Sequence, residues 1–272
     1  MIMASPTWLV SLIKKGFPFR FVLARLSRLS PVRRVMDKLL FEGDDIYYLP
    51  RDNVIHVNQE LPSFASTPLP SRIIDTFIKK ANHAWIMNKC ICRDASKCKE
   101  YPIDLGCLFL GDSVVGINPS LGKKVSKEEA RAHVQRCRDA GLVQLIGKNR
   151  LDASWLMVPE ATLLTICNCC PCCCLWRMLP ALHPDLSANV KKLDGVSIRV
   201  TDGCTGCGAC EKGICFVDAI QVVNGKARIS GDCRGCGRCA SACPGHAIKV
   251  TVTDPAYLDK PERRIDSIVS LK

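Results

Sequence analysis

The sequence predicts an α+β fold, in which a cysteine-rich domain of helices and a hairpin precedes a smaller domain built on an internal repeat. Three observations support this prediction. Segments with the helical spacing of apolar residues alternate with short β-branched segments. A cysteine triplet that begins at Cys204 recurs at Cys233, near the end of the chain. The remaining cysteines gather in the middle of the chain.

The number and spacing of the cysteines exclude more classes of function than any other feature of the sequence. The chain of 272 residues contains 19 cysteines, an odd number, and most of them lie two or fewer residues apart. This spacing suits metal chelation better than separate disulfides. We therefore expect a metal or iron–sulfur protein of a reducing compartment, the cytoplasm. No run approaches the ~18 apolar residues of a membrane-spanning helix, and no small-residue cleavage site of a secretory signal follows the first apolar segments.

Residues 1–41 are predicted to form a basic amphipathic N-terminal arm. They carry eight basic side chains and one acidic one, which is +7 of the chain's formal net charge of +12. Apolar residues between Trp8 and Leu23 interleave with the basic ones. This pattern suits peripheral contact with an anionic membrane surface or with an acidic partner. A helical arm that packs on its own domain is an equal alternative, and organellar transit peptides share the Arg-rich, acid-poor composition.

Residues 42–70 are predicted to be an extended segment followed by a proline-rich linker. Two short runs, 46–49 and 54–57, have the composition of strands. Three prolines then interrupt the chain and favour an irregular connection. These prolines are Pro62, Pro68 and Pro70.

The cysteine-rich domain is expected over residues 71–196. Residues 71–88 place apolar side chains, Trp85 among them, on one helical face and predict a helix. Ser126–Glu129 is a capping box that begins a second helix, and a hairpin is predicted to follow it. Residues 126–155 thus look like part of a winged helix, and an iron–sulfur DNA-binding regulator must be weighed. Both basic and acidic side chains lie on that helix, and they form no continuous basic surface that could contact the phosphates of DNA. We therefore expect no nucleic-acid partner.

Ten cysteines of this domain are candidate ligands of a further metal centre, for which we prefer iron–sulfur to zinc. Ten unpaired thiols in two tight groups have no packing role, so we expect a subset to bind one centre, with two thiolates from each group and Arg93 offsetting their charge. Packing or a disulfide is the alternative for some of them. Cys137 lies on the apolar face of the capped helix and is expected to be a packing residue. The ten candidates are Cys90, Cys92, Cys98, Cys107, Cys167, Cys169, Cys170, Cys172, Cys173 and Cys174.

Residues 197–254 contain the repeat, and each half has three cysteines at spacings of three, a fourth cysteine and a short β-branched strand. This pattern resembles the bacterial two-cluster ferredoxin motif. The resemblance implies a ferredoxin-like domain with two [4Fe–4S] clusters, in which the fourth cysteine of each half serves the other cluster. Cluster one would take Cys204, Cys207, Cys210 and Cys243. Cluster two would take Cys233, Cys236, Cys239 and Cys215.

The first half of the repeat departs from the ferredoxin pattern. Four residues separate Cys210 from Cys215, where the second half has three between the equivalent cysteines, and Phe216 stands where the second half has Pro244. One extra residue in a loop changes the local backbone more than the ligand. Two zinc sites are the alternative, but zinc ribbons pair two Cys-x2-Cys arms and do not string three cysteines before an isolated fourth.

The sequence names no catalytic residue, since His246 is the lone histidine of the repeat and is better explained by packing. Residues ~45–253 also resemble an uncharacterised family of ferredoxin-ended proteins of anaerobic prokaryotes, which has no assigned activity. We expect an electron-transfer protein or redox-complex subunit with a protein redox partner. The alternative is a redox enzyme whose middle cysteines act on a substrate with electrons from the ferredoxin domain. Residues 255–272 are left as a C-terminal tail.

Overall fold

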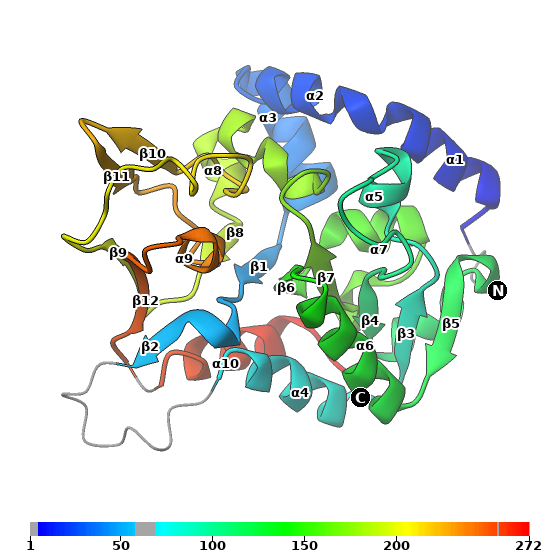
Figure 1. The fold of residues 1–272 in the computed structure, drawn as a ribbon. Helices are drawn as coiled ribbons and strands as arrows, with labels where there is room; N and C mark the ends of the chain where they lie inside the picture. Colours follow the sequence, from blue (N-terminus) through cyan, green and yellow to red (C-terminus); the bar gives the residue numbers. More distant parts are fainter. Residues whose placement is uncertain (1–4, 58–68, 255, 272) are drawn as a thin grey trace.

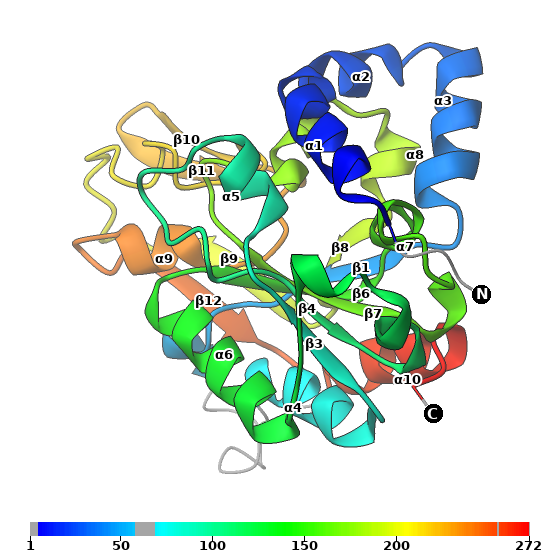
Figure 2. The same cartoon turned by 90° about the vertical axis from the view of Figure 1, so that its right-hand side faces the viewer.

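The computed structural model describes residues 5–57, 69–254 and 256–271, so residues 58–68 of the predicted linker lie outside the described part. A seven-stranded sheet occupies the centre, with helices on both of its faces (Figures 1 and 2). This mixture of helix and strand agrees with the predicted α+β class. The strands in spatial order are β5 (Gly122–Val125), β3 (Ala84–Met87), β4 (Leu108–Leu110), β7 (Leu164–Cys169), β6 (Val143–Lys148), β1 (Asp45–Tyr48) and β8 (Val190–Lys192).

The neighbouring strands of this sheet pair antiparallel, except that β8 runs parallel to β1. None of the described helices combines the length and hydrophobicity that crossing a bilayer demands. The helices are α1 (Thr7–Gly16), α2 (Arg20–Leu26), α3 (Ser30–Met36), α4 (Ser71–Lys80), α5 (Ile91–Ala95), α6 (Lys127–Asp139), α7 (Arg150–Leu156), α8 (Pro184–Ser187), α9 (Arg238–Ala242) and α10 (Asp259–Ile268), with a 3-10 helix at Leu175–Ala181.

Alternation along the strands divides the hydrophobic core between the two faces of the sheet. On β3, Ile86 packs in the core beneath α4 and α6, whereas Trp85 packs in the core beneath α1 and α7. On β7, Ile166 belongs to the first core, whereas Cys167 and Cys169 belong to the core on the other face. Successive side chains of a strand point to opposite faces, so β7 directs these two thiols toward the N-terminal helices.

The helix predicted over 71–88 is shorter than expected. Helix α4 ends at Lys80, and β3 begins at Ala84 and pairs with both β4 and β5. All four residues of β3 are buried, as a strand covered on both faces requires. The prediction that Trp85 continues a helical face is therefore wrong, because a short apolar run has no period that separates a helix from a buried strand.

The capping box at the start of α6 is confirmed. Ser126 accepts a hydrogen bond from the backbone N–H of Glu129, and the Glu129 carboxylate accepts one from the Ser126 N–H. The predicted hairpin is wrong, because α7 follows β6 where a second strand was expected. Trp155 and Leu156 of α7 are buried against the sheet, and this packing stabilises a helix there. Residues 126–155 thus have no wing, and the winged-helix interpretation loses its structural basis.

The N-terminal arm packs on the rest of the chain. Helices α1–α3 lie across one side of the molecule, over α5 and α8 (Figure 2). Ala24 and Phe41 are buried, and Lys14 forms an ion pair with Asp94 of α5 at 2.8 Å. Arg28 donates hydrogen bonds to backbone carbonyls of the 3-10 helix. These contacts agree with the alternative that the arm packs on its own domain.

The C-terminal repeat contributes to two small sheets at one end of the molecule (Figure 1), and one of them also contains a strand from residues 55–57. The strands predicted after each cysteine set are observed, one in a hairpin and one in a three-stranded sheet. The tail is helical, and Lys80 of α4 pairs with Glu262 and Asp266 of α10. The hairpin is β10 (Ile220–Val223) with β11 (Lys226–Ile229), and the other sheet is β2 (Ile55–Val57), β12 (Ile248–Val252) and β9 (Val196–Val200).

Candidate metal centres

The four cysteines assigned to cluster two line one enclosed space. Three of them come from the loop before α9 and its first turn, and Cys215 comes from the loop before β10. The cavity between them has a volume of about 20 Å³, and the aromatic side chains of Tyr48 and Phe216 help to close it. Burial, followed by the neighbouring thiols, raises the pKa of Cys236 to about 12. Such thiols ionise most readily when a metal compensates the charge.

The cysteines assigned to cluster one lie nearer the surface. Cys207 is exposed, whereas Cys210 is buried. The fourth cysteines of the two halves have equivalent hydrogen bonds, since the Sγ atoms of Cys215 and Cys243 each accept a backbone N–H from the alanine four residues later, at 3.3 Å. The repeat is therefore present in the hydrogen bonding as well as in the spacing of the cysteines.

The loops between the cysteines depend on glycine. Gly206 has a φ of +68°, and its equivalent in the second half, Gly235, has a φ of +73°, a region that favours glycine. A Cβ atom at Gly206 would overlap the carbonyl oxygen of Gly225 in the β10–β11 turn. In both halves the backbone can therefore turn tightly around the thiols. The thiols, N–H groups and glycines of the two loops fit [4Fe–4S] clusters.

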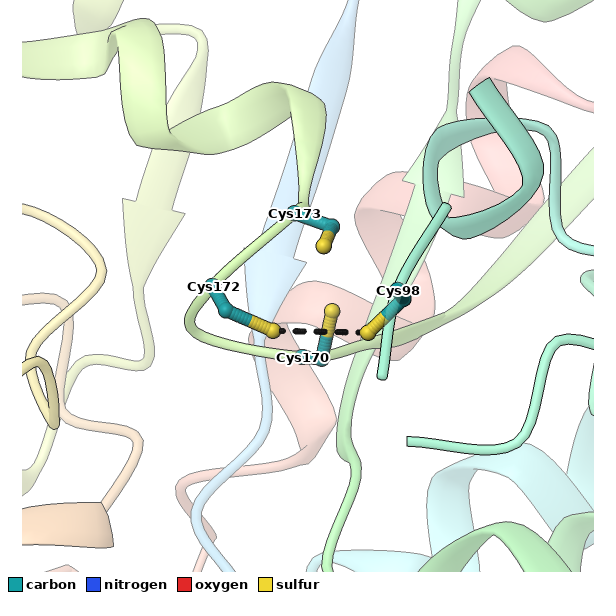
Figure 3. A group of neighbouring side chains, drawn as sticks. All are labelled: Cys98, Cys170, Cys172 and Cys173. Carbon is teal, nitrogen blue, oxygen red and sulfur yellow. Dashed lines mark hydrogen bonds between the residues drawn. The ribbon is translucent and has the colours of Figure 1, made fainter. Parts of the chain in front are cut away.

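A separate group of four thiols forms in the cysteine-rich part, and Figure 3 shows the four side chains turned toward one another. Cys98 follows α5, and the other three come from the turn after β7. All four Sγ atoms lie within 4.8 Å of one another, and those of Cys98 and Cys172 are 3.6 Å apart. We call Cys98, Cys170, Cys172 and Cys173 the four-thiol site.

The four-thiol site has the dimensions of a tetrahedral site for one ion. Four thiolates at the usual Zn–S distance stand about 3.8 Å apart, close to the observed separations. The thiolates at the corners of a cubane stand farther apart, because irons and sulfides lie between them. Burial raises the pKa of Cys170. Burial also opposes ionisation of Cys98, but hydrogen bonds from Cys173 and backbone N–H groups outweigh it and lower the pKa of that thiol.

The other six candidate cysteines surround a cavity on the opposite side of β7, which we call the six-thiol cavity. Its volume is about 140 Å³, and Ile13 and Phe17 of the N-terminal arm form part of its wall. Cys170 of the four-thiol site also reaches this wall, so the two sites are adjacent. The six cysteines are Cys90, Cys92, Cys107, Cys167, Cys169 and Cys174.

Arg93 lies between the two groups of thiols. Its side chain is fully buried, and it donates hydrogen bonds to the backbone carbonyls of Asn168 (2.8 Å) and Leu105. Burial opposes its charge, but the neighbouring thiols, chiefly Cys90 and then Cys170, outweigh burial and raise the pKa of the guanidinium. Arg93 was expected from the sequence to offset thiolate charge, and in the structure it lies beside thiols of both the four-thiol site and the six-thiol cavity.

Tyr48 links the six-thiol cavity to cluster two. Its side chain is fully buried, and its ring lies 5.5 Å from that of Phe216, centroid to centroid. Burial raises the pKa of Tyr48, and thiols of both sites, Cys174 first and Cys236 among the others, raise it further. One buried aromatic residue thus borders both thiol sets. No motif in the sequence marks Tyr48, which lies far from either set along the chain.

The candidate ligands therefore group differently from the expectation of one centre with two thiolates from each side. Four thiols do come together, but Cys98 is the only one from the first group of cysteines. Cys137 is fully buried on α6, 3.6 Å from the Nε2 atom of His133, so its predicted packing role is confirmed. Strand β7 ends at Cys169, so Cys167 and Cys169 lie on the strand whereas Cys170 begins the turn that follows it. This difference could be recognised only once the end of the strand was known.

Comparison with known proteins adds one match. A scan against protein families matches residues 228–249 to the 4Fe-4S binding domain family. The matched segment includes the four cysteines of the second half of the repeat. Searches of curated proteins and of solved structures found no match. The match supports at least one [4Fe–4S] cluster, and with the many cysteines it indicates an iron–sulfur electron-transfer protein.

Proposed function

We propose that the chain is an electron-transfer protein or redox-complex subunit that passes single electrons through two [4Fe–4S] clusters. The cysteines of clusters one and two assigned above would hold them. The observation that carries the proposal is the repeated loop, in which thiols, glycines at positive φ and N–H bonds to the fourth cysteine recur. A bound [4Fe–4S] cluster supplies a centre that takes up and releases one electron.

The two cluster sites differ in exposure, and this difference supports a direction of transfer. Cys207 of cluster one is exposed, so a protein redox partner can approach it. Cluster two borders the body of the protein, where Tyr48 and Phe216 line its cavity. Arg177 ties the two parts together by donating to the carbonyl of Pro171 at 2.9 Å and to that of Cys215 at 3.5 Å. Electrons would enter at cluster one and move inward.

We propose that the four-thiol site binds a single tetrahedral ion, zinc. The short sulfur–sulfur separations support one ion at this site, and a closed set of four thiolates is typical of structural zinc. The ion would tie the chain after α5 to the turn after β7. The preference for iron–sulfur that the spacing alone gave to the middle cysteines is therefore not kept for these four.

The cluster assignment is tested by serine variants of the full chain prepared without oxygen. Cys207→Ser should lower the iron content by about four irons per chain and weaken the dithionite-reduced EPR signal, and Cys236→Ser should do the same for the other cluster. The matched control is Cys137→Ser, which removes a buried thiol that is a ligand of none of the proposed centres, although it packs in the same core as Cys170 and Cys173 of the four-thiol site. Equal iron in all three variants and the wild type would refute the proposal.

The arm supports a second part of the proposal, peripheral contact with an anionic membrane surface. Nine of the thirteen exposed large apolar side chains of the described residues lie on the arm, outside its buried face, and eight basic side chains lie among them. Exposed apolar and basic groups together favour a lipid surface over an acidic protein. The nine are Trp8, Leu12, Phe19, Val22, Leu23, Leu26, Leu29, Val35 and Leu39.

Vesicle binding tests this contact. The double variant Trp8→Ala with Phe19→Ala removes two side chains that are 66% and 64% exposed, so it should fold normally and bind vesicles of anionic lipid at least about tenfold more weakly. The control is Val115→Ala, which removes an equally exposed apolar side chain away from the arm. No binding of the wild type to anionic vesicles at low salt would refute the contact and favour an acidic protein partner.

A further inference from the structure

We propose that the six-thiol cavity binds a polynuclear iron–sulfur cluster of its own, separate from the four-thiol site and from the clusters of the repeat. The inference rests on the proposed function, because it takes the chain to be an iron–sulfur protein. The proposed centre lies next to cluster two, farther from the surface than the exposed cluster one. Three features of the cavity support it: its size, its charge and its cover.

The size of the cavity excludes a single ion. A tetrahedral ion draws its four sulfurs to about 3.8 Å from one another, close to the separations in the four-thiol site. The six-thiol cavity instead keeps a volume of about 140 Å³ between its walls, room for several water-sized groups. Six thiols exceed the four that one ion takes, and soft thiolates are the ligands of iron–sulfur clusters. The space and the ligands together match a cluster of several irons and sulfides.

The buried guanidinium of Arg93 in the cavity wall favours an anionic ligand. Arg93 is fully buried and lines the cavity, and among the described residues its Nε atom has no hydrogen-bond partner. No carboxylate of the described residues pairs with Arg93, and the carboxylate that lines the wall, Asp152, accepts hydrogen bonds from Asn149 and Trp155 instead. A buried charge without a counter-ion is unfavourable. The surrounding thiols compensate this charge only when they are ionised, and binding a metal ionises them. A cluster bound by thiolates is anionic, so it would supply the missing counter-charge beside Arg93.

The rest of the lining keeps water out. The arm covers the cavity with Ile13 and Phe17, and Trp155 and Trp176 form other parts of the wall. Arg20 packs over the ring of Phe17, 4.1 Å from its centroid, and brings a second cation toward the thiols. A low-polarity enclosure with a few cations stabilises an anionic cluster and protects its sulfides from solvent. The N-terminal arm is thus part of the site.

The position of the cavity would connect the cluster to the repeat. Cys169 and Cys174 share one hydrophobic core with Tyr48, Phe216 and Cys236, so no solvent layer separates the cavity from cluster two. On binding, each ligating thiol releases its proton to solvent, and the iron and sulfide come from outside the chain. The six-thiol cavity would then be the inner end of the electron path.

The test is metal analysis of the full chain after anaerobic reconstitution with ferrous iron and sulfide. Two [4Fe–4S] clusters account for about eight irons and eight sulfides, and the wild type should exceed both counts by a matching increment. The double variant Cys107→Ser with Cys167→Ser should lose this increment of iron and sulfide together. It should keep the zinc of the four-thiol site and the reduced EPR signal of the repeat, which report that it has folded.

Variants of the other sites distinguish a failure of this proposal from a failure of the proposed function. Cys137→Ser should match the wild type, and Cys172→Ser should lose zinc while it keeps the increment. A wild type with only about eight irons and eight sulfides would overturn the proposal whatever the variants do, and so would an increment of zinc without sulfide. Failure of the proposed function gives a different result, since Cys207→Ser would then leave both iron and EPR signal unchanged.

Discussion

A glycine in the first cysteine loop gives a sharp test of how the backbone is fitted to cluster one. Gly206 lies between Cys204 and Cys207 with a φ of +68°. In the variant Gly206→Ala, the new Cβ atom would overlap the Gly225 carbonyl oxygen and lie 2.6 Å from the carbonyl carbon. Non-bonded carbons normally approach to about 3.5–4.0 Å. The β10–β11 turn would therefore have to move by about 1 Å.

The expected loss of stability in Gly206→Ala is the sum of two costs. A side chain in the left-handed region costs about 1–2 kcal/mol, and overpacking against backbone costs about 1–3 kcal/mol more. Gly208→Ala is the matched control, since Gly208 has a φ of +73° but its Cβ would lie no closer than 3.7 Å to any atom, the Glu211 carboxylate. The control incurs only the first cost. Gly206→Ala should therefore be destabilised by about 1–3 kcal/mol more than Gly208→Ala.

The assay is anaerobic urea titration of the loaded protein, followed by the loss of visible absorption and by the EPR signal of the reduced repeat. Gly206→Ala should lose the signal of cluster one at a lower urea concentration than Gly208→Ala, by about 1 M for a typical dependence on urea. The signal of cluster two should change less. Equal midpoints for the two variants would show that the approach of the Gly225 turn does not constrain the loop, and would refute the reasoning.

Two further predictions concern a buried carboxyl group and the arm. Burial raises the pKa of Asp44 from 3.8 to about 8, so the native state keeps a proton that the unfolded state loses and stability should fall as pH rises between those values. Asp44→Asn should show a smaller fall in the free energy of unfolding between pH 5 and pH 8, and a slope equal to that of the wild type would contradict the raised pKa. Deleting residues 1–41 should uncover the six-thiol cavity, so that a chelator removes its iron faster than from the full chain. Equal rates would show that Ile13 and Phe17 do not cover it.

The features that the sequence alone predicted correctly depend on local chemistry. The capping box of Ser126 and Glu129 needs only residues three apart, and it is observed. The short strands after the two cysteine sets are also local signals and are observed as β10 and β12. Cys137 was identified as buried from the helical period of its neighbours. The patterns of the capping box and of the helix face of Cys137 span a few residues, so tertiary structure did not change them. The composition that predicts β12 is also local, although its partners β2 and β9 lie far along the chain.

The features that the sequence missed depend on the sheet. The residues around Trp85 form a central strand because β4 and β5 pair with both of its edges, and neither partner is visible from residues 71–88. Helix α7 replaces the predicted hairpin because Trp155 packs on the sheet. The division of the thiols between two sites follows from the end of β7 at Cys169, after which the chain turns and Cys170, Cys172 and Cys173 meet Cys98. Spacing shows which thiols are near along the chain, but only the sheet shows which share a cavity.

The central claim is that the repeat holds two [4Fe–4S] clusters that carry single electrons. The most direct measurement is quantitative EPR of the anaerobically prepared full chain reduced with dithionite, together with acid-labile sulfide on the same sample. The account predicts at least about eight sulfides per chain, bleaching of the visible absorption, and a signal from interacting one-electron centres that integrates to at least about two spins. Stoichiometric zinc with no sulfide and no signal on reduction would contradict it.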